Sequence, residues 1–194
     1  MTKAQINRFK GIEKIPYKIL VYLALHNENV FKLLKYSDEH ALDKPNLTFK
    51  EKMQLLALNE GIDANKNLFL KPLVSDEMID SDAQLRVYQY CLQPYNSMLA
   101  VVSIRFDTIV GSKTSIIYDE DGIPVSRVTR IESEILDTLN GKDLVGIGDF
   151  SFNKDFSTID KEMLTLSNSK NFYGSYFIMS VRWMIDTNDS CVND

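Results

Sequence analysis

The sequence predicts an α+β fold, with N-terminal helices followed by a small, mainly antiparallel sheet that has one helix packed across it. Three observations predict this. Apolar residues recur at threes and fours before residue 62, as in helices. Apolar and polar residues alternate between Met98 and Val110, as in a strand with two different faces. A further helical pattern lies between residues 126 and 140, inside the β-rich half.

Composition predicts one folded domain. The chain has 194 residues, of which 44% are apolar and 25% charged, a balance typical of globular proteins. We therefore expect a single domain over residues 1–194, with a helical N-terminal region at 1–62 and a sheet-plus-helix body at 68–186.

Two helices are expected in the N-terminal region. The first covers residues 15–36 with one buried stripe, and Asn27 and Asn29 can divide it, because asparagine competes for backbone hydrogen bonds. A polar loop follows. Thr48 and Glu51 then form a capping-box pattern that opens a second helix, which we expect to run through Leu58 and stop at Gly61.

Six strands, two of them in a hairpin, and one helix are expected after residue 62. A short strand at 68–74 and a charged connection at 76–82 come first, followed by a strand at 85–90 and a hairpin at 98–118 that turns at 111–113. A turn at 119–122 then leads into a helix at 126–140, which Gly141 closes. The last elements are a strand at 145–152, a projecting loop at 153–170 and a long final strand at 172–185. In the hairpin, Val102, Ile104 and Phe106 should face the core, opposite Ser103, Arg105 and Asp107.

No pattern predicts a catalytic, cofactor-binding or metal site, so we do not expect an enzyme. His26 and His40 lack further ligands at zinc spacing. The turn Asp119 to Gly122 lacks the alternating ligands of a calcium loop. Gly146-Ile147-Gly148 lacks the third glycine and the helix of a dinucleotide site. The densest remaining group of carboxylates, which we expect to be solvated, is Asp76, Glu77, Asp80 and Asp82.

The cysteines and the final aromatic strand have ordinary structural explanations. We expect Cys91 to be a small buried apolar residue and Cys191 a thiol near the end, which is consistent with synthesis in a reducing compartment. Tyr173, Tyr176 and Trp183 are typical both of a core strand and of subunit contacts, and the sequence does not separate the two.

Charge and hydropathy exclude two classes of partner. The net charge is −5 and no basic block is present, which argues against tight nucleic-acid binding. No apolar stretch reaches the roughly 18–20 residues that a membrane-spanning helix needs, so no membrane partner is expected.

Part of the chain resembles the neck proteins of tailed bacteriophages, the group of tail terminators and head-tail connectors. The resemblance lies in the hairpin SMLAVVSIRFDTIVGSKTSIIYDE, the helix SRVTRIESEILDTLNG and the strand VGIGDFSF, all between Ser97 and Phe152. The segment NVFKLLKYSDEHALDKPNLT resembles the leading region of such proteins in large-genome phages. In that group, the same order of elements builds a small sheet with a helix packed across it.

The resemblance implies a non-catalytic virion protein, made in the host cytoplasm, that forms a six- or twelve-fold ring between portal and tail. Its partners would be further copies of itself and portal, connector or tail proteins. Duplex DNA would pass through the lumen without specific binding, which mild acidity would allow. Ring closure needs two different patches on each protomer, and we expect residues 107–114 or 153–170 to supply one.

Two other functions fit the residues. One is a small metal-dependent hydrolase that uses the carboxylates between Asp76 and Asp82. The other is a monomeric adaptor that binds one partner through the N-terminal helices.

Overall fold

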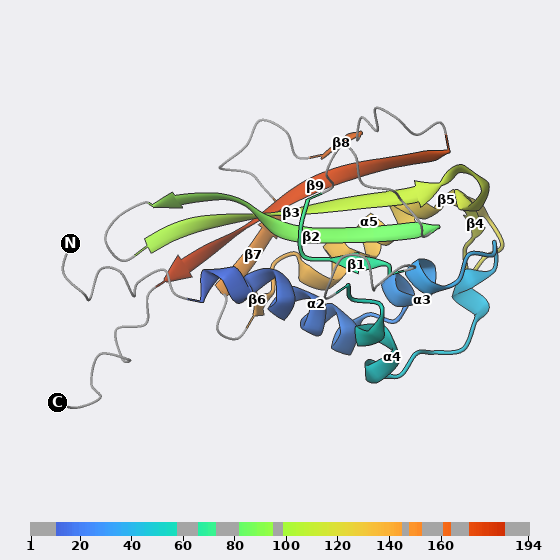
Figure 1. Ribbon diagram of the computed structural model, residues 1–194, viewed down its shortest axis with the longest axis horizontal. Coiled ribbons are helices and arrows are strands. Elements are labelled where there is room, and N and C mark those ends of the chain that lie inside the picture. Colours follow the sequence, from blue (N-terminus) through green and yellow to red (C-terminus); the bar gives the residue numbers. More distant parts are fainter. Residues whose placement is uncertain are drawn as a thin grey trace.

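The chain has an α+β fold, as the sequence predicts. The computed structural model describes residues 11–57, 66–72, 82–94, 99–144, 148–152, 161–163 and 171–184. Its main sheet has seven strands in the order β1-β2-β3-β9-β7-β6, and β8 also pairs with β9. All these pairings are antiparallel except β1 with β2. Figure 1 shows the helices gathered along this sheet, with the small β4–β5 ribbon at one end of the long axis.

The first predicted helix is divided at Asn27, in agreement with the prediction. The short 3-10 turn η2 (Ile12–Lys14) leads into α2 (Ile15–His26), and α3 (Asn29–Lys35) follows. The Asn27 side chain accepts a 2.9 Å hydrogen bond from the Val30 amide, so it caps the start of α3. Its amide nitrogen donates to Thr138 Oγ1 at 2.8 Å, which ties the break to the helix that crosses the sheet.

The capping box is confirmed, but the helix that it opens is shorter than predicted. After the 3-10 turn η3 (Ala41–Asp43), α4 (Phe49–Gln54) begins with reciprocal bonds between Thr48 and Glu51. It ends at Gln54 because the Leu55 carbonyl accepts from the amides of Asn67 and Leu68, both at 3.0 Å. Strand pairing thus replaces the next helical turn. The predicted continuation to Leu58 and Gly61 lies outside the described residues.

The centre of the sheet is made of three long strands. They are β2 (Ala83–Pro94), β3 (Leu99–Gly111) and β9 (Phe172–Met184), so the predicted strands at 85–90, 98–110 and 172–185 are confirmed in kind. β2 is longer than predicted and contains a bulge between Gln89 and Cys91. The predicted strand at 68–74 is reduced to β1 (Leu68–Phe69), and residues 73–81 lie outside the described residues.

The predicted hairpin of residues 98–118 is wrong. β3 pairs with β2 on one edge and with β9 on the other along almost its whole length, so neither edge can take another strand. The chain instead leaves the sheet through the 3-10 turn η4 (Ser112–Thr114), and β4 (Ile116–Tyr118) pairs with β5 (Pro124–Ser126) in a separate ribbon. Residues 107–111 therefore lie within β3 and form no projecting hairpin, and Asp107 is buried in the sheet.

The crossing helix is confirmed as α5 (Arg127–Leu139), and Gly141 follows it with a positive φ of 70°. The remaining strands are β6 (Asp143–Leu144), β7 (Gly148–Phe152) and β8 (Lys161–Met163). The strand predicted from 145 thus starts at Gly148, and residues 145–147 lie outside the described part. The loop predicted at 153–170 contains β8, which pairs with β9, and its other residues are not described.

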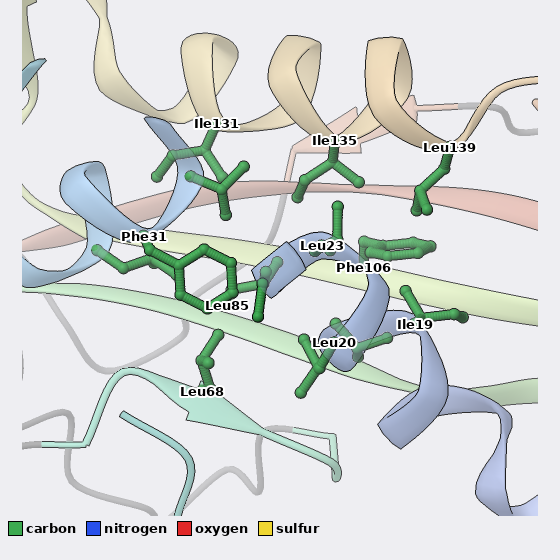
Figure 2. Packing of buried hydrophobic residues seen from close by; sticks show 14 of the residues in the cluster. Ile19, Leu20, Leu23, Phe31, Leu68, Leu85, Phe106, Ile131, Ile135 and Leu139 are labelled. Atoms are coloured by element: carbon green, nitrogen blue, oxygen red, sulfur yellow. The ribbon is translucent and has the colours of Figure 1, made fainter. Parts of the chain in front are cut away.

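The core lies between the helices and one face of the sheet. α2 and α3 contact β2, α5 contacts β3, and α2 and α3 also contact α5. Figure 2 shows Ile131, Ile135 and Leu139 of α5 facing residues from α2, α3 and the strands. Phe106 and Phe177 stack with ring centroids 4.8 Å apart. Val102, Ile104 and Phe106 belong to this core, as their alternation predicts.

A buried arginine fixes the loop after α3 to α5. Arg127 is fully buried, and its guanidinium donates to the carbonyls of Leu33, Tyr36 and Asp38 at 2.9, 2.5 and 2.7 Å. Burial lowers the pKa of Arg127, and this effect outweighs the negative charges of Asp38 and Asp82, which raise the pKa. The three carbonyls satisfy most of the donors of this guanidinium, so the residue joins the N-terminal helices to the body.

Candidate functional site

The face of the sheet turned away from the helices, called here the outer face, carries a group of polar and aromatic side chains. Strand alternation places every second side chain of β2, β3 and β9 on it. Its polar and aromatic residues include Gln84, Arg86, Tyr88, Tyr90, Ser103, Arg105, Asp107, Tyr176 and Ser180. The buried apolar residues Val101, Ile109 and Ile178 lie on the same face. Ser103, Arg105 and Asp107 lie on this face as the sequence predicts, because the neighbouring even-numbered residues of β3 enter the core.

An arginine, an aspartate and a tyrosine form the centre of the outer face. Arg105 Nε lies 2.6 Å from Asp107 Oδ1, and the Tyr88 hydroxyl donates to Asp107 Oδ2 at 2.9 Å. The Asp107 side chain is 3% exposed, so both of its oxygens are engaged away from bulk water. Burial and the Asp107 charge raise the pKa of Tyr88. Burial opposes the charge on Arg105, but the hydrogen bond and charge of Asp107 outweigh it and raise the Arg105 pKa.

The Arg105 guanidinium is held between two tyrosine rings. Its Cζ lies 3.6 Å from the ring centroid of Tyr176 and 5.8 Å from that of Tyr90. The side chain is 18% exposed. Its Nε is used by Asp107, whereas its two terminal nitrogens have no hydrogen-bond partner within the described part of the chain. A positioned guanidinium with free terminal nitrogens matches a carboxylate.

A second arginine is fully buried beside this centre. Arg86 Cζ lies 4.3 Å from the ring centroid of Phe69, and its terminal nitrogens donate to Gln84 Oε1 at 3.0 Å and to the Pro72 carbonyl at 3.2 Å. These contacts hold the chain after β1 against β2. Arg86 therefore serves the structure of the outer face rather than its chemistry.

β2 presents an open edge next to the outer face. β1 pairs with β2 only at Leu85 and Arg86, so β2 from Tyr88 to Pro94 has no neighbour on that side among the described residues. A shallow groove of about 400 Å³ runs along this edge; it is lined by Glu13, Pro16, Leu70, Lys71, Pro72, Tyr88, Gln89 and Tyr90. Tyr90 is 55% exposed and borders both the groove and Arg105. An unpaired strand edge is a ready site for association.

Helix α2 is apolar around most of its circumference. Its sequence, IPYKILVYLALH, contains two residues that can carry charge, and its buried side faces the core. The opposite side nevertheless carries Tyr17, Val21 and Leu25, and Leu25 is 62% exposed. We call these three residues the α2 stripe. A helix with apolar residues on all sides is normally covered on all sides, so the α2 stripe is a candidate contact surface.

A comparison with known protein families assigns this chain to one of them. The family model described as YomW matches residues 27–181, which span α3, α5 and the main sheet except for the last three residues of β9. The chain belongs to the YomW family. The family name is of the type given to phage genes, which indicates a phage-related protein. No curated protein matches the chain.

In this YomW-family chain, the two histidines lie in different surroundings. His26 ends α2 with its ring centroid 4.3 Å from that of Tyr22. His40 stacks on Tyr118, and its Nδ1 lies 3.4 Å from Asp43. No group of three or more potential metal ligands occurs within the described ranges.

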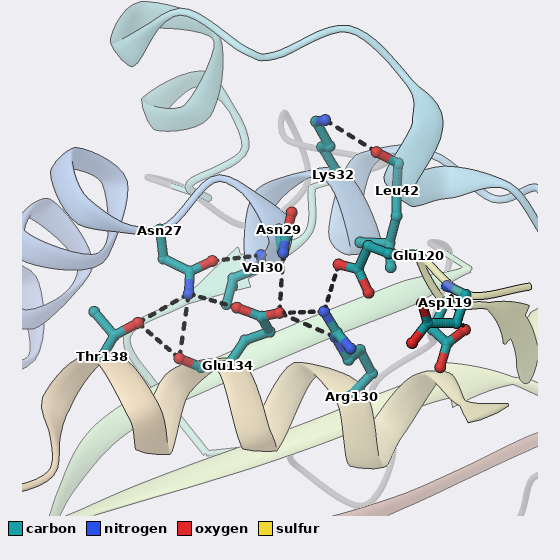
Figure 3. Close-up of polar contacts among 11 residues, drawn as sticks. Asn27, Asn29, Val30, Lys32, Leu42, Asp119, Glu120, Arg130, Glu134 and Thr138 are labelled. Atoms are coloured by element: carbon teal, nitrogen blue, oxygen red, sulfur yellow. Dashed lines mark hydrogen bonds and ion pairs between the residues drawn. The ribbon is translucent and has the colours of Figure 1, made fainter. Parts of the chain in front are cut away.

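The acidic turn Asp119–Gly122 is the tip of the β4–β5 ribbon. Asp119 Oδ1 accepts from the amides of Asp121 and Ile123 at 3.0 and 2.8 Å, which shapes the turn. Glu120 lies 2.6 Å from Arg130 of α5. Figure 3 shows this contact beside the network of Asn27, Asn29 and Glu134 that joins α5 to the N-terminal helices. The tip is therefore fixed to the body.

Other predicted residues have mixed outcomes. Asp76, Glu77 and Asp80 lie outside the described residues, and Asp82 is exposed, with its carbonyl accepting from the Gly111 amide at 2.8 Å. Gly146, Ile147 and Cys191 are not described. Cys91 is exposed, not buried, because the bulge and the open edge of β2 expose it. Within the described residues, no helix is long and apolar enough to cross a membrane.

The aromatic residues of the final strand divide between the two faces. Tyr173 and Trp183 pack against the core, and the Tyr173 hydroxyl donates to the Ser115 carbonyl at 3.1 Å. Tyr176 lies on the outer face against Arg105. The core interpretation is therefore confirmed for Tyr173 and Trp183, whereas subunit contact by Tyr176 stays a prediction.

Sequence reasoning missed the Arg105 centre and the α2 stripe. The signal for the first was present, since Arg105 and Asp107 share a face of β3, but Tyr88 and Tyr176 come from strands distant in sequence. The signal for the second was the nearly uninterrupted apolar run from Ile19 to Leu25, which was interpreted as a single buried stripe.

Proposed function

We propose that this YomW-family chain is a structural subunit of a phage neck. Copies of it would close into a six- or twelve-fold ring between portal and tail, as a tail terminator or head-tail connector. The protein would act by shape and contact area, without catalysis, and would reside in the virion neck. The phage-type family and the α+β body support this proposal.

The observation that carries the proposal is the α2 stripe. Tyr17, Val21 and Leu25 leave apolar surface exposed on a helix whose other side is buried in the core, and such surface in a virion protein is best explained by subunit contact. Leu25 alone would gain roughly 1–2 kcal/mol on full burial. A monomeric adaptor that uses the same stripe is the second candidate.

A ring also needs a second, different patch on each protomer. A head-to-tail contact joins unlike surfaces, and repetition of it closes a ring when the rotation fits. The β4–β5 ribbon meets this requirement, because it lies at the opposite end of the long axis from the start of α2 (Figure 1). Ile116 and Ile123 of the ribbon are exposed apolar residues.

The charge of the chain fits passage of DNA through a lumen. With a net charge of −5 and no basic block, the chain would let a duplex move without electrostatic capture, which needs lysine and arginine on the phosphates. A strongly positive lumen in an assembled ring would contradict this part of the proposal.

Native mass spectrometry of the purified full chain tests the proposal. A ring protein should give six- or twelve-fold species, and Leu25→Asp should shift them toward monomer. Thr129→Asp, a charge placed on the exposed side of α5, is the matched control and should assemble normally. A wild-type chain that stays monomeric, alone and with portal or tail proteins, would instead favour the adaptor.

A further inference from the structure

We propose that the Arg105 centre is the docking site for the β4–β5 tip of a second copy of this chain, with the Asp121 carboxylate seated on the Arg105 guanidinium and Ile123 in the neighbouring groove. This inference rests on the proposed ring and names its contact. The contact joins the tip of one copy to the Arg105 centre of the next, and these two surfaces do not touch each other within one protomer.

The receiving surface offers a fixed cation with unused donors. Asp107 holds Nε of Arg105 at 2.6 Å, and Tyr176 supports the guanidinium plane at 3.6 Å, so the terminal nitrogens are held in place before any partner arrives. These nitrogens bind no other group within the described residues. An ordered arginine loses little side-chain entropy on binding and can donate to a carboxylate from both terminal nitrogens.

An apolar recess adjoins this cation. The apolar part of the groove of about 400 Å³ along the β2 edge is formed by Pro16, Leu70 and Pro72, and Glu13 and Lys71 line the same groove. Leu70 is itself an exposed apolar residue. Tyr90 borders both the groove and Arg105, whose Cζ is 5.8 Å from its ring centroid. A partner that fills the recess should carry an acidic group beside an apolar one.

The inserted tip has that pair of side chains. Asp119 and Glu120 are used internally, by the turn amides and by Arg130, respectively. Asp121, in contrast, is exposed and has no ion pair among the described residues. Ile123, two positions later, is 55% exposed. The tip therefore presents one carboxylate and one apolar side chain a short distance apart, and the Glu120–Arg130 contact holds their orientation.

The two surfaces complement each other in charge and in polarity. The carboxylate faces the guanidinium, and the isoleucine faces the recess. Because tip and receiving surface are different parts of the protomer, the contact is head-to-tail, which is the type that a ring requires. No other described residue of the tip competes for Arg105, since the remaining carboxylates are occupied.

Sedimentation equilibrium of the full chain measures the contact as a subunit dissociation constant. Asp121→Lys should raise this constant at least about tenfold, because repulsion replaces attraction at a fixed arginine. Ile123→Ser should raise it about tenfold through lost apolar burial. Asp137→Lys makes the same charge change on the exposed side of α5 and should alter the constant by less than about twofold.

A double-mutant cycle tests whether the two side chains touch. Arg105→Lys keeps the charge but removes the planar fork, and Asp121→Asn removes the carboxylate. If they are in contact, the combined rise in dissociation constant is smaller than the product of the single rises. A combined rise equal to the product overturns the direct contact, as does wild-type assembly by Asp121→Lys and Ile123→Ser together.

Failure of this contact is distinguishable from failure of the ring. Rings that persist unchanged in the tip variants would refute the Asp121–Arg105 contact and leave the proposed function standing. A wild-type chain with no self-association in isolation would refute the contact, while its presence or absence in the neck of virions would decide the function separately.

Discussion

Replacement of Asp107 by asparagine tests how the outer face is held together. Asp107→Asn keeps the shape of the side chain and removes its charge, so Arg105 loses its ionic partner at 2.6 Å while Tyr88 can still donate to the amide oxygen. Removal of one member of a buried pair costs about 3–5 kcal/mol. The Arg105 side chain is 18% exposed, so water offsets part of this cost. We expect a loss of about 2 kcal/mol in the free energy of unfolding.

Urea denaturation followed by circular dichroism measures this loss. The matched control is Asp143→Asn, which neutralises an exposed carboxylate in β6 and should change stability by less than about 0.5 kcal/mol. The double variant Arg105→Met with Asp107→Leu should lose less than the sum of the two single changes, because no charge is left unpaired. A loss below about 1 kcal/mol for Asp107→Asn, equal to the control within error, would refute the view that the pair organises this face.

Three further predictions concern the core and the titration of the outer face. Arg127→Met leaves three carbonyls without their donor, so it should lower the free energy of unfolding by at least about 3 kcal/mol, measured by urea denaturation; an unchanged midpoint would contradict the proposed role. Phe106→Ala removes a ring stacked on Phe177 and should cost about 3–5 kcal/mol in the same assay. Because the folded pKa of Tyr88 is raised above its ordinary value of 10.0, the unfolded chain loses this proton first, and stability should fall as pH rises above that value. Tyr88→Phe should reduce this alkaline loss.

Local patterns predicted the elements whose signals lie within a few residues. The Thr48–Glu51 box and the helix closed by Gly141 depend on neighbouring side chains and on one positive φ, and both are confirmed. The division at Asn27 is confirmed for the same reason, since its side chain caps the next helix directly. The period of two in β3 correctly separated its core face from its polar face.

Pairings between distant segments could not be predicted in the same way. The residues after Gly111 have a strand-like composition, but β2 and β9 occupy both edges of β3, and β9 lies more than 60 residues further along the chain. β3 therefore pairs with β2 and β9 instead of forming the expected hairpin, and no local pattern reveals these partners. α4 ended early for a similar reason, because Leu55 and Leu56 pair with the segment at Asn67 and Leu68.

The candidate site was missed because its parts come from three strands. Arg105 alone suggested a polar position on β3, and its significance depends on Asp107 beside it, Tyr88 from β2 and Tyr176 from β9. The exposure of Leu25 likewise depends on which side of α2 the sheet covers. Sequence supplied the residue types, whereas the strand register determined which of them meet.

Cryo-electron microscopy of intact particles of a phage that encodes this chain tests the proposed neck function most directly. We expect a ring of six or twelve copies between portal and tail, with the β4–β5 tip of each copy against Arg105 of the next and the DNA path along the ring axis. Particles whose neck is fully assigned to other proteins, with this chain absent from the virion, would contradict it.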